Sequence, residues 1–261
     1  MEKFCSLYSS SSGNCTFIGC DGEGILIDAG VSAKKIEEAL RYIGSGIECI
    51  RAIFVTHEHS DHINGIRVLA SKHGIKVFAS KGTLDGMNER EIFKSKIDAY
   101  IMPAEGTEIC GMYVRPFRIS HDAYEPTGFT VVTPGGKRAA IATDMGIITE
   151  EAANALYGSN LVLLESNHDI NMLKMGPYPY PLKQRILSDV GHLSNDVCSG
   201  FAVELAKSGT KQFILGHLSK ENNHPSLAYE TTRLALTQAG FEENTDYRLT
   251  VAGDLNEPVL L

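Results

Sequence analysis

The chain has 261 residues, of which 43% are hydrophobic and 21% are charged, as in an ordinary globular protein. No apolar run approaches the roughly 20 residues that a membrane-spanning helix needs, so we expect no membrane association. A formal net charge of −8 argues against a protein that coats nucleic acid with a broadly basic surface, although bound divalent metals would add local positive charge that this count omits.

The start of the chain and its cysteines favour the cytoplasm. Residues 1–15 lack the basic and long apolar segments of a secretory signal. The six cysteines form neither a C-x-x-C pair nor a dense framework. Cys15 and Cys20 would suit a disulfide or a ligand pair, but free thiols are the expected state in a reducing compartment. Because no internal repeat or linker interrupts the sequence, we predict a single domain over residues 1–261.

Strands and helices alternate in the first part of the chain. A β-branched run at residues 24–30, which ends in an acid and a glycine, predicts a buried strand that stops at a turn. Ser32 is expected to cap a helix whose apolar residues recur at helical spacing. Residues 50–56 predict the next strand, followed by a helix that closes at Gly74 and by a strand at residues 75–80.

The middle of the chain is rich in predicted strands, and alternation resumes after residue 149. We expect strands at residues 112–119, 127–133, 137–144, 160–166, 212–217 and 247–251, with helices near residues 150–157, 195–207 and 227–239. Residues 170–187 are expected to be irregular, because three prolines within five residues cannot continue a helix. The mixture of elements predicts an α/β protein with two packed sheets and helices outside them.

The stretch VTHEHSDH at residues 55–62 concentrates metal-binding groups. His57 and His59 lie two apart at the end of a predicted strand, so both side chains can point to one ion. Asp61 and His62 follow in the turn that opens the next helix, and can serve a second ion. Imidazole and carboxylate ligands favour zinc, iron or manganese over calcium or magnesium. The alternative, a polar surface loop, leaves the packing of so many titratable groups unexplained.

Three further candidate ligands each follow a predicted strand and precede a turn. Side chains at strand ends are a common way to gather a site from distant parts of a chain. Alone, each of these residues would more often be a hydrogen-bonded structural residue. Together with the histidine cluster they predict a two-ion site, and the three are His121, Asp144 and His217.

This ordered set of ligands resembles the metallo-β-lactamase fold of binuclear hydrolases, over essentially the whole chain. The resemblance implies a four-layer αββα sandwich and two divalent transition-metal ions, which would be Zn, Mn or Fe. It implies that one ion is held by His57, His59 and His121, that the other is held by Asp61, His62 and His217, and that Asp144 bridges the two.

Other segments narrow the substrate class. Asp144 stands where true β-lactamases of this fold carry another ligand, and His59 stands where the di-iron relatives have glutamate. Residues 163–169 and 191–196 resemble the loops that flank the site in tRNA-processing nucleases and related phosphodiesterases. A Ser-Ser-Gly-Asn turn is expected before the first strand, and this segment is similar to that of the WalJ/YycJ-like branch. That resemblance implies a DNA exonuclease acting from 5′ ends, with metal-bound hydroxide attacking the phosphodiester.

Catalytic and substrate-binding roles are predicted for a few polar residues. Asp61 and His192 are the expected catalytic residues, with His192 donating to the phosphate or the leaving oxygen; the alternative for His192 is an exposed turn residue. Ser12 and Asn14 are expected in a loop over the substrate, although Ser-Gly-Asn is also ordinary turn chemistry. His168 is expected either to contact the substrate or to be a structural hydrogen-bond donor.

Three rival functions stay open. A thioester hydrolase of the glyoxalase II type uses the same ligand order, but would be expected to carry a separate C-terminal helical region, for which little chain remains after His217. An RNA or small-molecule phosphodiesterase of the same fold fits the ligands equally well. A non-catalytic metal-bound module would close its site with four ligands per ion and leave no position for water. The sequence does not decide the native metal or the oligomeric state.

Overall fold

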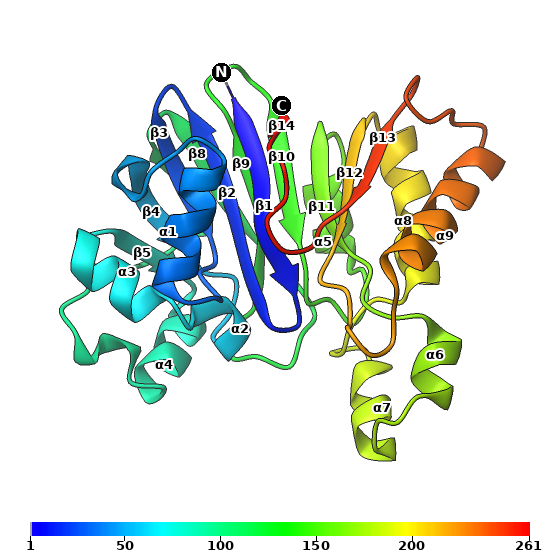
Figure 1. The fold of residues 1–261 in the computed structure, drawn as a ribbon, viewed down its shortest axis with the longest axis horizontal. Coiled ribbons are helices and arrows are strands. Elements are labelled where there is room, and N and C mark those ends of the chain that lie inside the picture. Colours follow the sequence, from blue (N-terminus) through cyan, green and yellow to red (C-terminus); the bar gives the residue numbers. More distant parts are fainter. Residues whose placement is uncertain (1) are drawn as a thin grey trace. The chain divides into compact units, whose positions relative to one another are not determined.

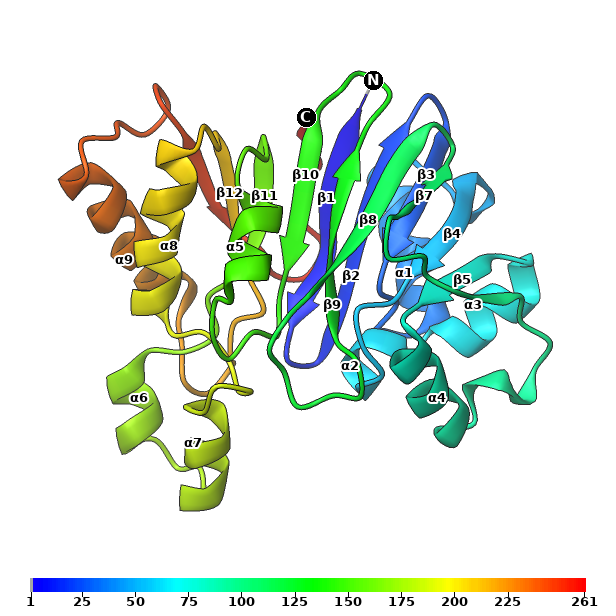
Figure 2. The same ribbon diagram turned by 180° about the vertical axis from the view of Figure 1, so that it is seen from behind.

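The computed structural model describes residues 2–261, and these divide into two compact units that are each described separately (Figures 1 and 2). The first unit comprises residues 2–116, Ala123–Lys137 and Gly253–Leu261. The second comprises Phe117–Asp122 and Arg138–Ala252. The single domain expected from the sequence stays a prediction.

A mixed sheet forms the centre of the first unit, with the strand order β14-β1-β2-β3-β4-β5-β6. The pairs from β14 to β3 are antiparallel, and those from β3 to β6 are parallel. The strands are β1 (Lys3–Ser10), β2 (Gly13–Cys20), β3 (Glu23–Ile27), β4 (Ile50–Phe54), β5 (Lys76–Ala79), β6 (Ala99–Ile101) and β14 (Val259–Leu260).

Helices α1 and α3 lie against this sheet (Figure 1). The predicted Ser32 cap is confirmed, because its side chain accepts a hydrogen bond from Lys35 N, and Gly74 ends α3 in the left-handed conformation as expected. The remaining elements of this unit are α1 (Ala33–Tyr42), η1 (Ile47–Cys49), α2 (Ser60–Ile63), α3 (Ile66–His73), α4 (Lys81–Glu89), η2 (Ile92–Lys94), β7 (Thr107–Ile109), most of β8 (Met112–Arg118) and β9 (Thr127–Val132).

Four parallel strands form the centre of the second unit, in the order β13-β12-β11-β10. The near-continuous apolar sequences of β10, β11 and β12 suit strands that are buried on both faces, whereas β13 is partly exposed. The long helices α8 and α9 pack beside them in Figures 1 and 2. The elements are β10 (Arg138–Ala142), α5 (Glu150–Leu156), β11 (Leu161–Glu165), α6 (Ile170–Met175), α7 (Tyr180–Ile186), α8 (Asn195–Lys207), β12 (Gln212–Gly216), α9 (Pro225–Gln238) and β13 (Arg248–Val251).

Two expectations about local structure were wrong. The Ser-Ser-Gly-Asn segment does not precede the first strand; it connects β1 to β2, and Asn14 lies within β2. The segment expected to be irregular forms α6 and α7 instead. Its prolines separate the two helices, and Pro181 occupies the first turn of α7, where its missing N–H costs no helical hydrogen bond.

Candidate functional site

The histidine cluster of the first unit follows the end of β4. Its strand is shorter than expected and ends at Phe54, so His57 lies in the loop before α2 and His59 at the N-cap of α2. The rings of His57 and His59 are 4.6 Å apart between centroids, and those of His57 and His62 are 4.0 Å apart. The three side chains therefore converge within this unit.

His62 is oriented by two buried polar neighbours. Its Nδ1 lies 2.8 Å from Asp28 Oδ2, and its Nε2 lies 3.1 Å from Asn14 Nδ2. A carboxylate accepts a proton, whereas an amide nitrogen donates one, so the contacts assign the ring proton to Nδ1 and a lone pair to Nε2. That is the tautomer in which a histidine binds a metal through Nε2 while a carboxylate holds its other nitrogen.

Asp28 connects this histidine to the end of β4, and it was not predicted from the sequence. Its Oδ1 accepts from Thr56 N at 2.8 Å, and its Oδ2 accepts from Thr56 Oγ1 at 2.9 Å. The Thr56 hydroxyl also lies 3.0 Å from His57 Nδ1. Asp28 follows the end of β3, as Asp144 follows the end of β10. The pattern that predicted Asp144, an acid after a strand, was therefore also present at Asp28.

The turn after β3 packs tightly against α2 at a glycine. A Cβ atom on Gly30 would overlap the carbonyl oxygen of Asp61 and approach Asn14 N to 2.6 Å. Gly30 N also donates to Asn14 O at 2.7 Å. Asn14 Nδ2 in turn contacts Asp61 Oδ2 at 3.4 Å. Only glycine allows the two backbones to approach this closely. Their close approach positions Asp61 beside His62.

The second unit gathers acids and histidines at the carboxyl ends of three parallel strands. Asp144 follows β10, Glu165 ends β11 and His217 follows β12. The carboxyl ends of parallel strands lie at one edge of a sheet, which is a common place for sites. Asp144 and His217 adopt left-handed backbone conformations, with φ of 61° and 55°.

Glu165 is the centre of this group, and it was also not predicted as a site residue. Its Oε1 lies 2.8 Å from both His192 Nδ1 and His217 Nδ1. Its Oε2 accepts from Met145 N at 2.7 Å and from Leu193 N at 3.2 Å. Burial alone would raise the pKa of this carboxyl, but the two histidines outweigh burial and lower its pKa to about 2.

The predicted ligands of the second unit surround Asp144. His217 Nε2 lies 3.5 Å and His121 Nε2 lies 3.7 Å from Asp144 Oδ1. His121 Nδ1 is oriented by the carbonyl oxygen of Gly191 at 3.1 Å. Burial lowers the pKa of His121 against the opposing effect of Asp144, which favours the neutral imidazole that a metal requires.

His192 lies within the same group, as the sequence suggested. Its side chain is 12% exposed, and Nδ1 contacts Glu165, so the alternative of a solvent-exposed turn residue was wrong. Asp144, Glu165, His192 and His217 can each offer one ligand atom within 4.8 Å of the others. Ser194, two residues later, caps α8, because its side chain accepts a hydrogen bond from Val197 N.

The predicted substrate contacts differ from their expected positions. Ser12 lies exposed in the β1–β2 turn, whereas Asn14 is buried in β2 and contacts His62 and Asp61. His168 is only 1% exposed, and neither of its ring nitrogens has a hydrogen-bond partner among residues 2–261. The ring therefore lies inside the protein, and the structural-donor alternative also finds no acceptor in the described part of the chain.

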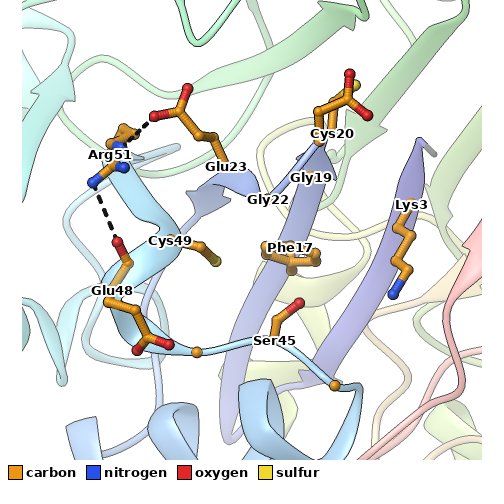
Figure 3. A pocket seen from close by; sticks show the side chains of 13 residues that line it. Lys3, Phe17, Gly19, Cys20, Gly22, Glu23, Ser45, Glu48, Cys49 and Arg51 are labelled. Atoms are coloured by element: carbon orange, nitrogen blue, oxygen red, sulfur yellow. Dashed lines mark hydrogen bonds and ion pairs between the residues drawn. The ribbon is translucent and has the colours of Figure 1, made fainter.

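A separate cavity of about 590 Å³ lies at the other end of the first unit's strands. Its wall includes Lys3 near the start of β1, Phe17 in β2 and Cys49 before β4 (Figure 3). Arg51 there is held by Glu23 at 2.8 Å. Because His57 follows the end of β4, this cavity is distinct from the histidine cluster of the same unit.

The donor sets of both units fit divalent transition metals. They consist of imidazole and carboxylate groups that are buried or partly buried, and the carboxylates at Nδ1 of His62 and His217 fix the tautomer that has its lone pair on Nε2. Within residues 2–261, no helix is long and apolar enough to cross a membrane.

Comparison with known proteins identifies relatives over nearly the full length. Residues 24–218 match a family model described as the beta-lactamase superfamily domain. The exodeoxyribonuclease WalJ of Streptococcus pneumoniae is 37% identical over 251 residues, which cover 95% of this chain and 93% of that protein. The exodeoxyribonuclease YycJ of Bacillus anthracis is 37% identical over 240 residues, covering 91% of this chain and 90% of that protein.

Solved structures agree on the fold. The metallo-beta-lactamase fold protein YhfI from Bacillus subtilis has a TM-score of 0.70 at 14% identity and covers 97% of both chains. The short form of human tRNase Z has a TM-score of 0.66 at 19% identity, covering 100% of this chain and 99% of that chain. At these identities the likeness concerns the fold alone, and it confirms the predicted class of mixed α/β sandwich.

Proposed function

Because the chain belongs to the beta-lactamase superfamily, we propose that it is a metal-dependent hydrolase that degrades DNA as an exonuclease. The observation that carries this proposal is 37% identity across 95% of the chain to an exodeoxyribonuclease. The sequence had pointed to the same activity through its resemblance to the WalJ/YycJ-like branch. Removal of nucleotides from the 5′ end is the polarity we propose.

We propose two divalent ions, Zn, Mn or Fe, held by the ligands expected from the sequence. One would be bound by His57, His59 and His121, the other by Asp61, His62 and His217, and both by Asp144. When bound, such ions supply Lewis-acid stabilisation of charge on a phosphate. The support is the chemistry of the donors: the structure orients His62 through Asp28, and His217 through Glu165, in the tautomer that metal binding requires.

His192 is the residue we propose to exchange a proton with the substrate. Glu165 fixes its Nδ1 at 2.8 Å, so Nε2 is the atom left to donate a proton to the departing sugar oxygen. The negative charge of Glu165 would stabilise positive charge on the imidazole ring next to it. We propose that Asn14 positions Asp61 as a metal ligand. Asp61 would then have its predicted catalytic role by holding the metal. Ser12 stays a proposed substrate contact, since it is exposed.

A cytoplasmic location is also proposed. All six cysteines are free thiols, the state that a reducing compartment maintains.

Three substrates distinguish this function from its rivals. Manganese- and zinc-loaded protein is incubated with 5′-labelled duplex DNA, with bis-p-nitrophenyl phosphate and with S-lactoylglutathione. We expect stepwise shortening of the DNA and slower hydrolysis of the phosphodiester model compound. The His57→Ala variant should lose both activities, whereas His73→Ala, a matched change at a histidine that contacts Glu37 at 2.9 Å, should retain them.

Each other outcome has a defined meaning. Hydrolysis of S-lactoylglutathione alone would replace the nuclease with a thioester hydrolase. Hydrolysis of bis-p-nitrophenyl phosphate without any attack on DNA would leave a phosphodiesterase with another substrate. Release of label only as single nucleotides from the 5′ end would support the proposed polarity, and release from the 3′ end would reverse it.

A further inference from the structure

Helices α6 and α7 form a two-helix projection in the second unit, which we call the α6–α7 arm and define as residues 170–188. Figures 1 and 2 show the arm extending away from the strands of its own unit. It begins two residues after His168 and ends four residues before His192. A short loop would be enough to connect β11 to α8. Two helices in this place therefore indicate a function of their own.

The arm exposes large apolar side chains. Met175 is 88% exposed and Tyr180 is 72% exposed, and Met172 and Leu187 are also exposed. Exposed methionine and tyrosine side chains provide polarisable, partly flat surfaces that suit stacking with planar groups. Most of the arm's apolar residues thus face outward, with only Leu173 and Ile186 buried.

The arm is basic within an acidic protein. It contains Lys174, Lys183 and Arg185 and no aspartate or glutamate, in a chain with 32 acidic and 24 basic residues. Lys183 Nζ donates to the carbonyl oxygens of Lys174 and Gly176, both at 2.7 Å. These partners are neutral, so the positive charge of Lys183 remains uncompensated, and Lys174 is exposed beside it.

The base of the arm is fixed to site residues of the same unit. Arg185 forms two hydrogen bonds with the Asp122 carboxylate, at 2.5 and 2.8 Å, and Asp122 directly follows His121. His192 N donates to Ile186 O at 3.0 Å. A Cβ atom on Gly191 would overlap the carbonyl oxygens of Arg185 and Ile186, which shows how closely the two segments pack. A ligand held by the arm is therefore held at a set position relative to His192.

We propose that the α6–α7 arm binds the unpaired strand of the DNA substrate, with bases stacked on Tyr180 and Met175 and a phosphate beside Lys174. This inference rests on the proposed nuclease function. Stacking on exposed aromatic side chains beside positive charge is how proteins bind single strands without regard to sequence. DNA carries a negative charge at every phosphate and offers planar bases, so both the basic side chains and the exposed apolar side chains of the arm find complementary groups on it.

The test compares long and short substrates. We would measure KM and kcat for single-stranded oligonucleotides of about 4 and about 16 nucleotides, and the rate on bis-p-nitrophenyl phosphate, for the wild type and for the double variant Met175→Ala/Tyr180→Ala. Loss of base stacking should raise KM for the longer oligonucleotide on the order of 10-fold. The rate on the small phosphodiester should stay unchanged, which also shows that the variant folds.

Two control variants remove exposed side chains elsewhere. Tyr42→Ala in α1 and Leu234→Ala in α9 delete side chains that are 57% and 48% exposed, and neither should alter KM. Lys174→Glu should weaken binding of the longer oligonucleotide at low salt, and the weakening should shrink as salt rises, because the interaction with phosphate is electrostatic.

The outcomes separate the arm from the proposed function. An unchanged KM for the longer oligonucleotide in the double variant, with DNA degradation intact, would overturn the arm proposal and leave the nuclease standing. Absence of any attack on DNA by the wild type, with the small phosphodiester still hydrolysed, would overturn the proposed function. A concentration-dependent dimer in sedimentation that the double variant abolishes would assign the arm to self-association instead.

Discussion

Asp28 and His62 form a buried carboxylate–imidazole pair at 2.8 Å that fixes which ring nitrogen of His62 carries the proton. Asp28 contacts Nδ1 of His62, so any effect of Asp28 on a bound metal is transmitted through His62. Its partner Thr56 ties the same carboxylate to the backbone just before His57. Metal affinity should therefore depend on a residue that touches no metal.

Replacing Asp28 by asparagine should lower metal affinity. The amide would no longer stabilise the Nδ1–H tautomer of His62, and the loss of such a partner costs about 10- to 100-fold in affinity. Competition with a zinc chelator would measure this. Asp85→Asn, at an exposed aspartate that pairs with Lys81, serves as the matched control. Equal zinc affinity in both variants would show that Asp28 does not orient the ligand.

Glu165 and His192 should behave as one functional unit. His192→Gln removes the proposed proton donor, which should slow DNA hydrolysis by about 10²- to 10⁴-fold. If Glu165 acts through His192, adding Glu165→Gln to that variant should slow hydrolysis much less than it slows the wild type. Measurement of the rates for the wild type, both single variants and the double variant completes a double-mutant cycle.

Glu165 also holds His217, so the bound zinc of each variant must be measured in parallel. His192→Gln should retain its zinc, whereas Glu165→Gln should bind it more weakly. Additive losses in rate, with the zinc content unchanged, would mean that the two residues work independently.

Gly30→Ala should disrupt the first unit's ligands. The added Cβ would collide with the Asp61 backbone, which cannot move away as a flexible side chain would. We expect a loss of about 2 to 4 kcal/mol in the free energy of unfolding, as for other overpacked sites. Gly200→Ala in α8 is the matched change, since nothing lies within 4 Å of its Cβ.

The control should stabilise the protein by about 0.5 to 1 kcal/mol, because alanine favours the helix. Urea denaturation of both variants gives the comparison. A Gly30→Ala variant as stable as the wild type would show that the turn after β3 accommodates a side chain.

His168 should make stability fall in mildly acidic solution. Burial lowers its pKa from 6.5 to about 4, so the folded protein takes up a proton at His168 less readily than the unfolded chain does. Stability is then fully retained above pH 6.5 and decreases as the pH falls from there toward 4. The loss should reach about 2 kcal/mol at pH 5.

Replacing His168 by leucine removes this titration. Urea denaturation of both proteins at pH 8 and pH 5 should show a smaller decrease in the variant. Because other histidines titrate in both proteins, the difference between the two decreases isolates His168. Equal decreases would mean that the ring is protonated in the folded protein as easily as in the unfolded chain.

The local sequence determined how much of the site could be predicted. His57, His59, Asp61 and His62 lie within six residues, so their number alone indicated a metal site. Glu165 and Asp28 gave a weaker signal, because a single acid after an apolar strand is also common at ordinary turns. Only the positions of the folded strands show that Glu165 lies between two histidines distant in sequence.

The elements were predicted where their patterns were regular. Residues 195–207 form α8 with the expected bounds, because a capping serine and an amphipathic run agree there. The α6–α7 arm was missed because its prolines were taken to exclude helices altogether. They exclude only one continuous helix, and Pro181 fits the first turn of the second. The strand β1 was missed because its polar serines conceal a buried strand.

Asp144 and His217 stand in the left-handed region of backbone space, which residues with a β-carbon avoid. Glycine would relax either position, and selection for thermostability alone would favour it there. The backbone at both positions thus carries local strain together with the side chains that the proposed metal site uses. A screen for heat resistance alone would not select for those two side chains.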